Sequence, residues 1–318
     1  MRALRQYLKS ELAGMLIRKG IHALRRLREA ICRAVCSERM CSRAKGTYRY
    51  WSNCRRLKPL IKNERRLLLH SREQHKLVRW ANDRKPLVSV VIPTWNRGEL
   101  LAARTIPSVL TQTYPHLEIV IVGDCCTDNT AQLLASLKDP RIHFVNLPER
   151  GQYPSETKAL WQVAGSVPKN KGLDLCSGNW IAPLDDDDMF TPDHVESLLH
   201  YAQEKDLELV YGRLRIEEAA GRWKEKGLVN KHMSIQNSTM LFRSYVKLFR
   251  SDINAWRVGL TGDYHRTIRF RETGVRIGYL DKIVALMPLR PGQTKIGLSA
   301  HDRPEAAVIS APARMGSQ

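Results

Sequence analysis

The sequence predicts an α/β fold, in which a mostly parallel sheet is flanked by helices and preceded by a basic helical extension. Short β-branched runs alternate with helix-like segments from Leu87 onward, which is the pattern of βαβ units. The first quarter of the chain lacks that alternation and carries most of the positive charge. The expected architecture of the α/β part is therefore Rossmann-like, with a separate arm before it.

The length of 318 residues suffices for one substantial core and a helical appendage. We expect three parts: a basic helical extension over residues 1–86, the α/β domain over 87–300, and a disordered tail over 301–318. Residues 1–86 contain 24 Lys or Arg and 6 Asp or Glu, a net charge of +18. Residues 87–318 contain 28 Lys or Arg and 26 Asp or Glu, a net charge of only +2.

Apolar residues recur at steps of three and four over residues 2–39, which predicts one or two amphipathic helices. A second helix is expected over 57–80, followed by a linker at 82–86. A basic amphipathic segment can bind an anionic membrane surface or nucleic acid, or it can be a solvated helical face. Of the two polyanions we favour a membrane surface, bound through residues 1–80.

Nothing in the sequence matches a membrane-spanning or secretory segment. No stretch reaches the roughly 18 apolar residues that a transmembrane helix needs, and charges interrupt the N-terminus too often for a signal peptide. The seven cysteines are odd in number and match no zinc-finger spacing. We therefore expect a cytoplasmic protein, peripheral at the inner face of the membrane.

The first half of the α/β domain has the regular pattern of parallel strands and crossover helices. Buried strands are expected at residues 88–92, 117–122, 142–146 and 180–184, and helices at 99–111, 130–137 and within 168–178. The second half is more mixed. It has a helix over 192–204, a strand over 209–214, a turn at Gly221 and a helix over 262–272.

Polar residues follow three of these strands. The first strand ends in Pro93-Thr94-Trp95-Asn96, the second in Gly123-Asp124, and the fourth in four consecutive aspartates, Asp185–Asp188. Ligands of open parallel sheets bind at the carboxyl ends of the strands. The three strand ends are therefore expected to form one binding site.

The four aspartates are the strongest chemical signal in the chain. Adjacent carboxylates repel each other unless water screens them or a cation offsets them. Carboxylate oxygens suit Mg²⁺ or Mn²⁺, and Mg²⁺ fills its remaining positions with water and substrate phosphates. A metal–diphosphate site is the expectation. The alternative is a solvated acidic turn before the helix that starts near Pro192.

Two further positions fit a nucleotide ligand. The carboxylate of Asp124 can accept hydrogen bonds from the N–H or hydroxyl groups of a nucleoside, although a turn or capping role is an alternative. Lys169 and Asn170 precede the fourth strand, where a cation beside a diphosphate is chemically reasonable. A solvated loop is the alternative for this pair.

Four segments in this order resemble family-two glycosyltransferases. They are Val88–Arg97 (VSVVIPTWNR), Ile119–Thr130 (IVIVGDCCTDNT), Asn170–Gly178 (NKGLDLCSG) and Trp180–Pro192 (WIAPLDDDDMFTP). The resemblance covers about residues 87–290 and leaves out residues 1–80. It implies an inverting enzyme with the A-type glycosyltransferase fold, so that 87–300 would be the catalytic domain.

The resemblance also implies roles for single residues. Asp263, at the start of a late helix, would be the catalytic base, and the metal ligands would be Asp187 and Asp185. The acceptor would lie near Ser238 and Thr239. The residues expected to bind the nucleotide-sugar are Pro93, Thr94, Asn96, Asp124, Lys169, Asn170, Asp185 and Asp186.

The implied reaction moves a sugar from a nucleotide-sugar, a UDP-sugar by default, to a glycan or lipid-linked hydroxyl. It would require Mg²⁺ or Mn²⁺ and serve surface polysaccharide or glycoconjugate synthesis. Two features depart from the family pattern: Gly123 replaces one carboxylate of the family's Asp-Asp pair, and Gly262 replaces the Glu before the base.

Two alternatives to this function remain. A nucleotidyltransferase would use a similar sheet but usually needs a glycine-rich phosphate loop after the first strand, which residues 94–98 do not provide. A non-catalytic polyanion-binding protein with a degenerate domain is the other, and the retained aspartates argue against it.

Overall fold

The computed structural model describes residues 48–77, 85–226 and 235–294. The chain divides into two compact units, Met1–Arg55 and Arg56–Gln318. Within the first unit, residues 48–55 are helical. The amphipathic helices expected over 2–39 and the tail expected over 301–318 lie outside the described residues. All further structure belongs to the second unit.

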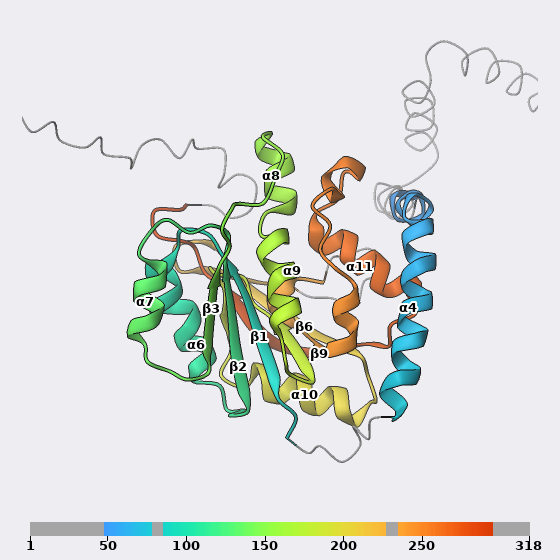
Figure 1. The fold of residues 1–318 in the computed structure, drawn as a ribbon, viewed down its shortest axis with the longest axis horizontal. Coiled ribbons are helices and arrows are strands. Elements are labelled where there is room, and N and C mark those ends of the chain that lie inside the picture. The colour runs from blue at the N-terminus through green and yellow to red at the C-terminus, as the bar shows by residue number, and fades with distance from the viewer. Residues whose placement is uncertain (1–47, 78–84, 227–234, 295–318) are drawn as a thin grey trace, which may run out of the picture. The chain divides into compact units, whose positions relative to one another are not determined.

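One sheet of nine strands runs through the described part of this unit (Figure 1). Its strand order is β3-β2-β1-β4-β8-β6-β9-β5, and β7 pairs with β6. The strands are β1 (Val88–Thr94), β2 (Leu117–Gly123), β3 (Ile142–Asn146), β4 (Trp180–Pro183), β5 (Met189–Phe190), β6 (Leu209–Ala219), β7 (Arg222–Lys226), β8 (Met240–Arg243) and β9 (Ile277–Met287).

The sheet changes character at β4, as the sequence pattern indicated. Strands β1 to β4 pair in parallel, with β1 at their centre between β2 and β4. Beyond β4 the pairing is mixed: β8 is antiparallel to β4 and β6, whereas β6 and β9 are parallel. The predicted α/β class is therefore confirmed, and its parallel half contains all three strand ends that carry the expected site.

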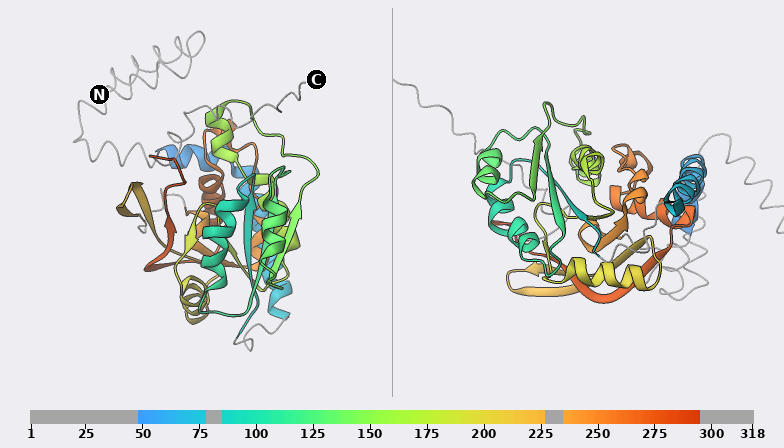
Figure 2. Two further views of the ribbon diagram at one scale, coloured as in Figure 1. Left: turned by 90° about the vertical axis from the view of Figure 1, so that its left-hand side faces the viewer. Right: turned by 60° about the horizontal axis from the view of Figure 1, so that its bottom comes forward.

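Helices cover both faces of the sheet (Figures 1 and 2). A continuous helical segment joins α5 (Gly98–Leu100), a π-helical turn (Leu101–Thr105) and α6 (Ile106–Leu110). The others are α4 (Lys58–Leu77), α7 (Thr130–Ser136), α8 (Thr157–Val163), α9 (Ser166–Leu175), α10 (His194–Glu204) and α11 (Gly262–Thr273), with 3-10 turns at Asn237–Thr239, Ser244–Leu248 and Ala255–Val258. Helix α8 was not predicted, because its seven residues lie in a stretch rich in Gly, Pro and Ser.

The two-residue period of the strands builds two cores. In β1, Val88, Val90 and Ile92 face the core that α6, α7 and α10 cover, while Val91 faces the opposite core of α4, α9 and α11. Successive side chains of a strand point to opposite faces, so strands buried on both sides are apolar throughout. This is why the sequence shows uninterrupted β-branched runs rather than alternation.

Helix α4 is an integral part of the second unit, although the sequence analysis assigned it to the extension. Its Leu68 is fully buried in the core with α9 and α11. Glu64 forms a buried ion pair with Arg269 of α11, and Arg72 binds the buried Glu208 through two hydrogen bonds of 2.6 Å. None of the described helices is long and apolar enough to cross a membrane.

Gly172 sets the distance between α9 and the sheet. A Cβ atom at this position would lie 2.6 Å from Cγ1 of Val91, a fully buried and stiff side chain of β1. We predict that Gly172→Ala lowers the free energy of unfolding by about 1–3 kcal/mol, since overpacking outweighs the gain in helix propensity. Urea denaturation measures this. Lys171→Ala, at the exposed neighbouring position, is the control and should change stability by less than about 0.5 kcal/mol.

Candidate active site

A cavity of about 520 Å³ lies at the carboxyl ends of β1, β2 and β4. Its walls come from segments far apart in the sequence, including the start of α11 and the loop after β9. The predicted site residues that line it are Pro93, Thr94, Asp124, Lys169, Asp185, Asp186, Asp187, Thr239 and Asp263. The expected convergence of the strand ends on one cleft therefore occurs.

The register of the parallel strands produces this convergence. Thr94, the last residue of β1, is paired with Gly123, the last residue of β2. The next residue, Asp124, donates its backbone N–H to the Thr94 carbonyl at 2.8 Å. The buried Asp124 carboxylate accepts a 3.0 Å hydrogen bond from the N–H of Gly151, and it lies 3.9 Å from Nε of Arg150. It thus stands at the cavity wall with acceptor capacity left for a ligand.

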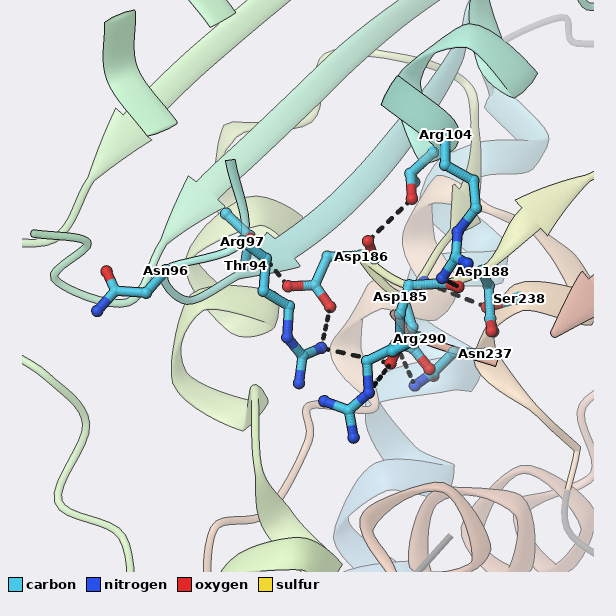
Figure 3. Close-up of polar contacts among 12 residues, drawn as sticks. Thr94, Asn96, Arg97, Arg104, Asp185, Asp186, Asp188, Asn237, Ser238 and Arg290 are labelled. Carbon is cyan, nitrogen blue, oxygen red and sulfur yellow. Dashed lines mark hydrogen bonds and ion pairs between the residues drawn. The ribbon is translucent and has the colours of Figure 1, made fainter. Parts of the chain in front are cut away.

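The aspartates after β4 have different partners, and Figure 3 shows Asp186 turned away from Asp185 and Asp188. The Asp186 carboxylate turns back toward β1, where it accepts 2.8 Å and 2.6 Å hydrogen bonds from Thr94 and Arg97. Asp188 is 1% exposed and accepts a 2.5 Å hydrogen bond from Ser238. Of the three that line the cavity, only Asp185 and Asp187 keep more than a quarter of the side chain exposed.

Positive side chains surround these carboxylates. The buried Lys169 ammonium lies 3.7 Å from Asp185, and Arg97 and Arg290 approach Asp187 to 3.4 Å and 3.6 Å. Arg104 holds the backbone of the loop, because it donates a 2.6 Å hydrogen bond to the Asp187 carbonyl. The sequence analysis identified Lys169 but assigned no role to Arg97 or Arg104. Arg97 stands inside a quoted motif, so its proximity to the aspartates was the available signal.

Burial and mutual repulsion perturb the carboxylates. Burial raises the pKa of Asp185 to about 6 in spite of the Lys169 charge, and the negative charges of the other acids, Asp263 first, add to the rise. Burial also raises the pKa of Asp186, and it raises that of Asp188 well above the usual range. Asp188 therefore supports the loop as a hydrogen-bonded carboxyl group, while Asp185 lines the same cavity as Asp263.

Asp263 sits in the first turn of α11, where it lines the cavity. The N-cap of this helix is Thr261, whose hydroxyl accepts a 3.4 Å hydrogen bond from the N–H of Tyr264. Asp263 is therefore not required to cap the helix. Asp263 lines the same cavity as Asp185, Asp186 and Asp187, which follow β4.

Three predicted residues do not line the cavity. Asn96 has a left-handed backbone (φ 49°) and its side chain accepts a 2.8 Å hydrogen bond from the N–H of Thr127, so it shapes the turn after β1. Asn170 exchanges hydrogen bonds of 2.8 and 2.9 Å with the backbone of Ser251. Ser238 bridges the Asp185 N–H and the Asp188 carboxyl group. Each of the three side chains stabilises a segment that carries or adjoins cavity residues.

Several cavity residues were not predicted to bind ligand. The Arg150 guanidinium lies over the Trp95 ring, 3.3 Å from its centroid, and Tyr153 lines the same end of the cavity beside Asp124. Helix α8 contributes Leu160, Trp161 and Gln162 to the other side. Trp95 follows β1 within a quoted motif, whereas the other residues lie between β3 and α9, outside the quoted motifs.

Comparison with known proteins agrees with this geometry. The family model described as glycosyl transferase family 2 matches residues 89–269. The chain is 37% identical over 123 residues to TuaG of Bacillus subtilis, named as a glycosyltransferase of teichuronic acid biosynthesis; the match covers 38% of this chain and 44% of TuaG. It is 33% identical over 175 residues to the poly(ribitol-phosphate) beta-N-acetylglucosaminyltransferase TarP of Staphylococcus aureus. That match covers 52% of this chain and 49% of TarP.

A solved structure shares the fold. The crystal structure of S. aureus TarS superposes with a TM-score of 0.50 and 16% sequence identity, over 64% of this chain and 37% of TarS. At that identity the likeness shows the fold alone. The chain spans less than half the length of the relatives TuaG and TarP.

The Arg97–Asp186 pair should stabilise the loop. Arg97→Met leaves the buried Asp186 carboxylate without its cation, and we expect a loss of about 1–3 kcal/mol in the free energy of unfolding. The double variant Arg97→Met/Asp186→Asn should recover much of that loss, because an amide needs no counter-charge. Arg141→Met, which breaks the more exposed 2.8 Å pair with Asp139, is the control. Equal losses in all three variants, measured in urea, would contradict this account of the loop.

Proposed function

The chain belongs to glycosyl transferase family 2 and is a glycosyltransferase, and on this basis we propose its reaction. It transfers a sugar from a nucleotide-sugar, a UDP-sugar, to a hydroxyl group of a glycan or lipid-linked acceptor, with inversion at the anomeric carbon. The observation that carries the proposal is the placement of Asp124, Asp185, Asp187 and Asp263 on the walls of one cavity. A nucleoside end, a diphosphate end and a base are thereby available to a single substrate pair.

The carboxylates fit a divalent cation of the Mg²⁺ or Mn²⁺ type. Within residues 48–77, 85–226 and 235–294, no three His, Cys, Asp or Glu side chains gather as a complete metal site. Mg²⁺ commonly takes one or two carboxylates and completes its shell with water and phosphate oxygens. Asp187 and Asp185 would supply that pair, and a cation there would offset the repulsion between these neighbouring carboxylates. The ion would stabilise the charge that develops on the leaving diphosphate.

The protein's own groups serve the rest of the reaction. Lys169, Arg97 and Arg290 lie within 4 Å of the aspartates, so their charges can also contact the diphosphate. Asp263 accepts the proton of the acceptor hydroxyl while the hydroxyl oxygen forms a bond to the anomeric carbon. The bond from that carbon to the phosphate oxygen breaks, and the nucleoside diphosphate leaves from the opposite face. This in-line displacement inverts the anomeric centre.

The biological role is inferred from the relatives. TuaG is named for teichuronic acid biosynthesis and TarP for transfer to poly(ribitol-phosphate). We assign this chain to the same kind of process, the synthesis of a surface polysaccharide or glycoconjugate. A nucleotidyltransferase would release pyrophosphate instead of a nucleoside diphosphate, so the released product separates the two reactions.

The catalytic assignment is tested by a donor screen with Mn²⁺ or Mg²⁺ that measures release of nucleoside diphosphate. Asp263→Asn should lower kcat by about 10²–10⁴-fold, the usual contribution of general-base catalysis. Asp187→Ala should raise the metal concentration needed for half-maximal activity, and chelation should abolish turnover of the wild type. Asp281→Asn, an exposed carboxylate beyond the cavity, is the control and should leave kcat unchanged. Wild-type turnover in both site variants would refute the assignment.

We further propose that the enzyme works at the cytoplasmic face of the membrane, held there by basic helices. Helix α4 presents Lys58, Lys62 and Arg66 on its exposed side, together with Leu67 and Leu69, which are 41% and 53% exposed. Exposed leucines among cations suit the interface of an anionic bilayer. Residues 1–47, which carry 12 Lys or Arg and 3 Asp or Glu and so +9 of the extension's net charge, lie outside the described part of the chain.

Reversal of two α4 charges should weaken this binding. Each Lys or Arg near an anionic surface contributes about 1 kcal/mol, so Lys62→Glu/Arg66→Glu should lower the partition constant on phosphatidylglycerol vesicles by at least about tenfold. Sedimentation of the full-length chain with the vesicles measures this. The control is Arg222→Glu/Lys224→Glu on the exposed hairpin strand β7, which makes the same change in net charge. Equal effects of the two pairs, or none, would remove α4 from the membrane contact.

A further inference from the structure

We propose that Trp161 of α8 is a stacking platform for a pyranose ring of the acceptor, beside the base Asp263. The inference rests on the proposed function and deepens it, because it gives the acceptor a defined subsite and a chemical class. The family motifs do not include α8. In the sequence this helix lies between β3 and α9, and three of its residues line the cavity.

Helix α8 is fixed in place although it has only seven residues. Glu156 caps it by accepting 3.0 Å hydrogen bonds from the N–H groups of Lys158 and Ala159. Ala159 and Val163, one turn apart, are both buried at 1% exposure. The side chains between them, Leu160, Trp161 and Gln162, are only partly buried and line the cavity. Burial of Ala159 and Val163 anchors the helix, and Trp161 is one of the partly buried residues that it contributes to the cavity lining.

The same helix abuts the segment that carries the base. A Cβ atom on Gly262 would lie 3.5 Å from the carbonyl oxygen of Gln162, so α8 reaches the residue immediately before Asp263. Helix α8 also packs against the 3-10 turn Ala255–Val258 that leads into α11, and the two stand side by side in Figure 1. A sugar on Trp161 would therefore present its hydroxyl groups to the Asp263 carboxylate.

Two tryptophans that line the cavity differ in what occupies their faces. Trp95, at the nucleotide end, already carries the Arg150 guanidinium on its ring. Within the described part of the chain, Trp161 has no such cation or aromatic partner. Trp180 shows the contrasting core role, since it is 2% exposed. A large, rigid aromatic face that borders a cavity and lacks a protein partner is the feature expected of a ligand-stacking residue.

The chemistry of the surface matches a pyranose. The C–H face of a sugar ring is apolar, whereas its hydroxyl groups need hydrogen-bonding partners around the edge. The indole provides an apolar plane, and the Gln162 amide in the cavity lining can donate and accept hydrogen bonds at the rim. Glycine at 262 leaves room at that edge. The donor's nucleotide and diphosphate are held at the strand ends, so the ring on Trp161 belongs to the acceptor.

The experiment compares Trp161→Ala and Trp161→Phe with the wild type in the full-length chain. Three quantities are measured: KM for the acceptor found in the screen, KM for the donor, and the rate of donor hydrolysis without acceptor. Trp161→Ala should raise the acceptor KM by about tenfold or more, the size of one aromatic stacking contact. The donor KM and the hydrolysis rate should stay within about twofold. Trp161→Phe should restore most of the acceptor affinity because it keeps an aromatic face.

Trp223→Ala on β7, a partly buried tryptophan outside the cavity, is the matched control and should change none of the three quantities. An increase in the donor KM with an unchanged acceptor KM would place Trp161 in the donor site and overturn the proposal. An unchanged acceptor KM in Trp161→Ala would overturn it as well.

A binding measurement separates this inference from the proposed function. Saturation-transfer NMR with cellotriose and chitotriose, in the presence of UDP and Mn²⁺, should detect pyranose binding by the wild type and by Trp161→Phe but not by Trp161→Ala. If no nucleotide-sugar is turned over while this difference holds, the proposed reaction fails and the platform stands. If turnover is observed while Trp161→Ala and the wild type bind the trisaccharides alike, or neither binds them, the platform fails and the reaction stands.

Discussion

The architecture of the site depends on accommodating several carboxylates within one partly buried loop. Four consecutive aspartates leave a fully buried strand, and Asp263 adds a fifth acid from α11. Such crowding is unfavourable unless each group has a separate solution. Each of the four aspartates has a polar partner. Asp188 is hydrogen-bonded to Ser238, and Asp186 pairs with Arg97. Asp185 lies near Lys169, and Asp187 lies near Arg97 and Arg290. The two carboxylates that remain partly exposed are those that a cation and a diphosphate can use.

The parallel sheet makes that arrangement possible. Because β1 lies between β2 and β4 in register, the residues that follow each strand reach the same edge. Thr94 shows the consequence, since its carbonyl accepts a bond from the backbone of Asp124 while its hydroxyl donates to Asp186. One residue of β1 therefore links Asp124 to the acidic loop. The close packing of α9 on β1 at Gly172 keeps Lys169 at the level of the strand ends.

The sequence allowed prediction of the parts whose patterns are local. Apolar runs in β1, β2 and β4 and the helical periodicity of α4, α10 and α11 are properties of neighbouring residues, and the structure confirms each element. The strand-end rule then located Thr94, Asp124 and the aspartates in one cavity. The features that the sequence did not predict depend on contacts between residues far apart in the chain. Arg97, which pairs with Asp186 and Asp187, lies in the turn between β1 and α5, and the short helix α8 is anchored by two buried residues. Asn96 and Asn170 have polar side chains of the expected type, yet both are committed to backbone hydrogen bonds.

Helix α4 shows how a segment outside the family resemblance is tied to the chemistry. Glu64 is buried against Arg269, and burial raises its pKa to about 7 although the guanidinium opposes the rise. The same arginine also donates to the Arg250 carbonyl, next to the Ser251 backbone that Asn170 binds from α9. A chain of contacts thus runs from α4 through α11 to α9, the helices that supply Asp263 and Lys169. Since the exposed side of α4 is basic, the helix that meets an anionic surface would be the one that braces the base.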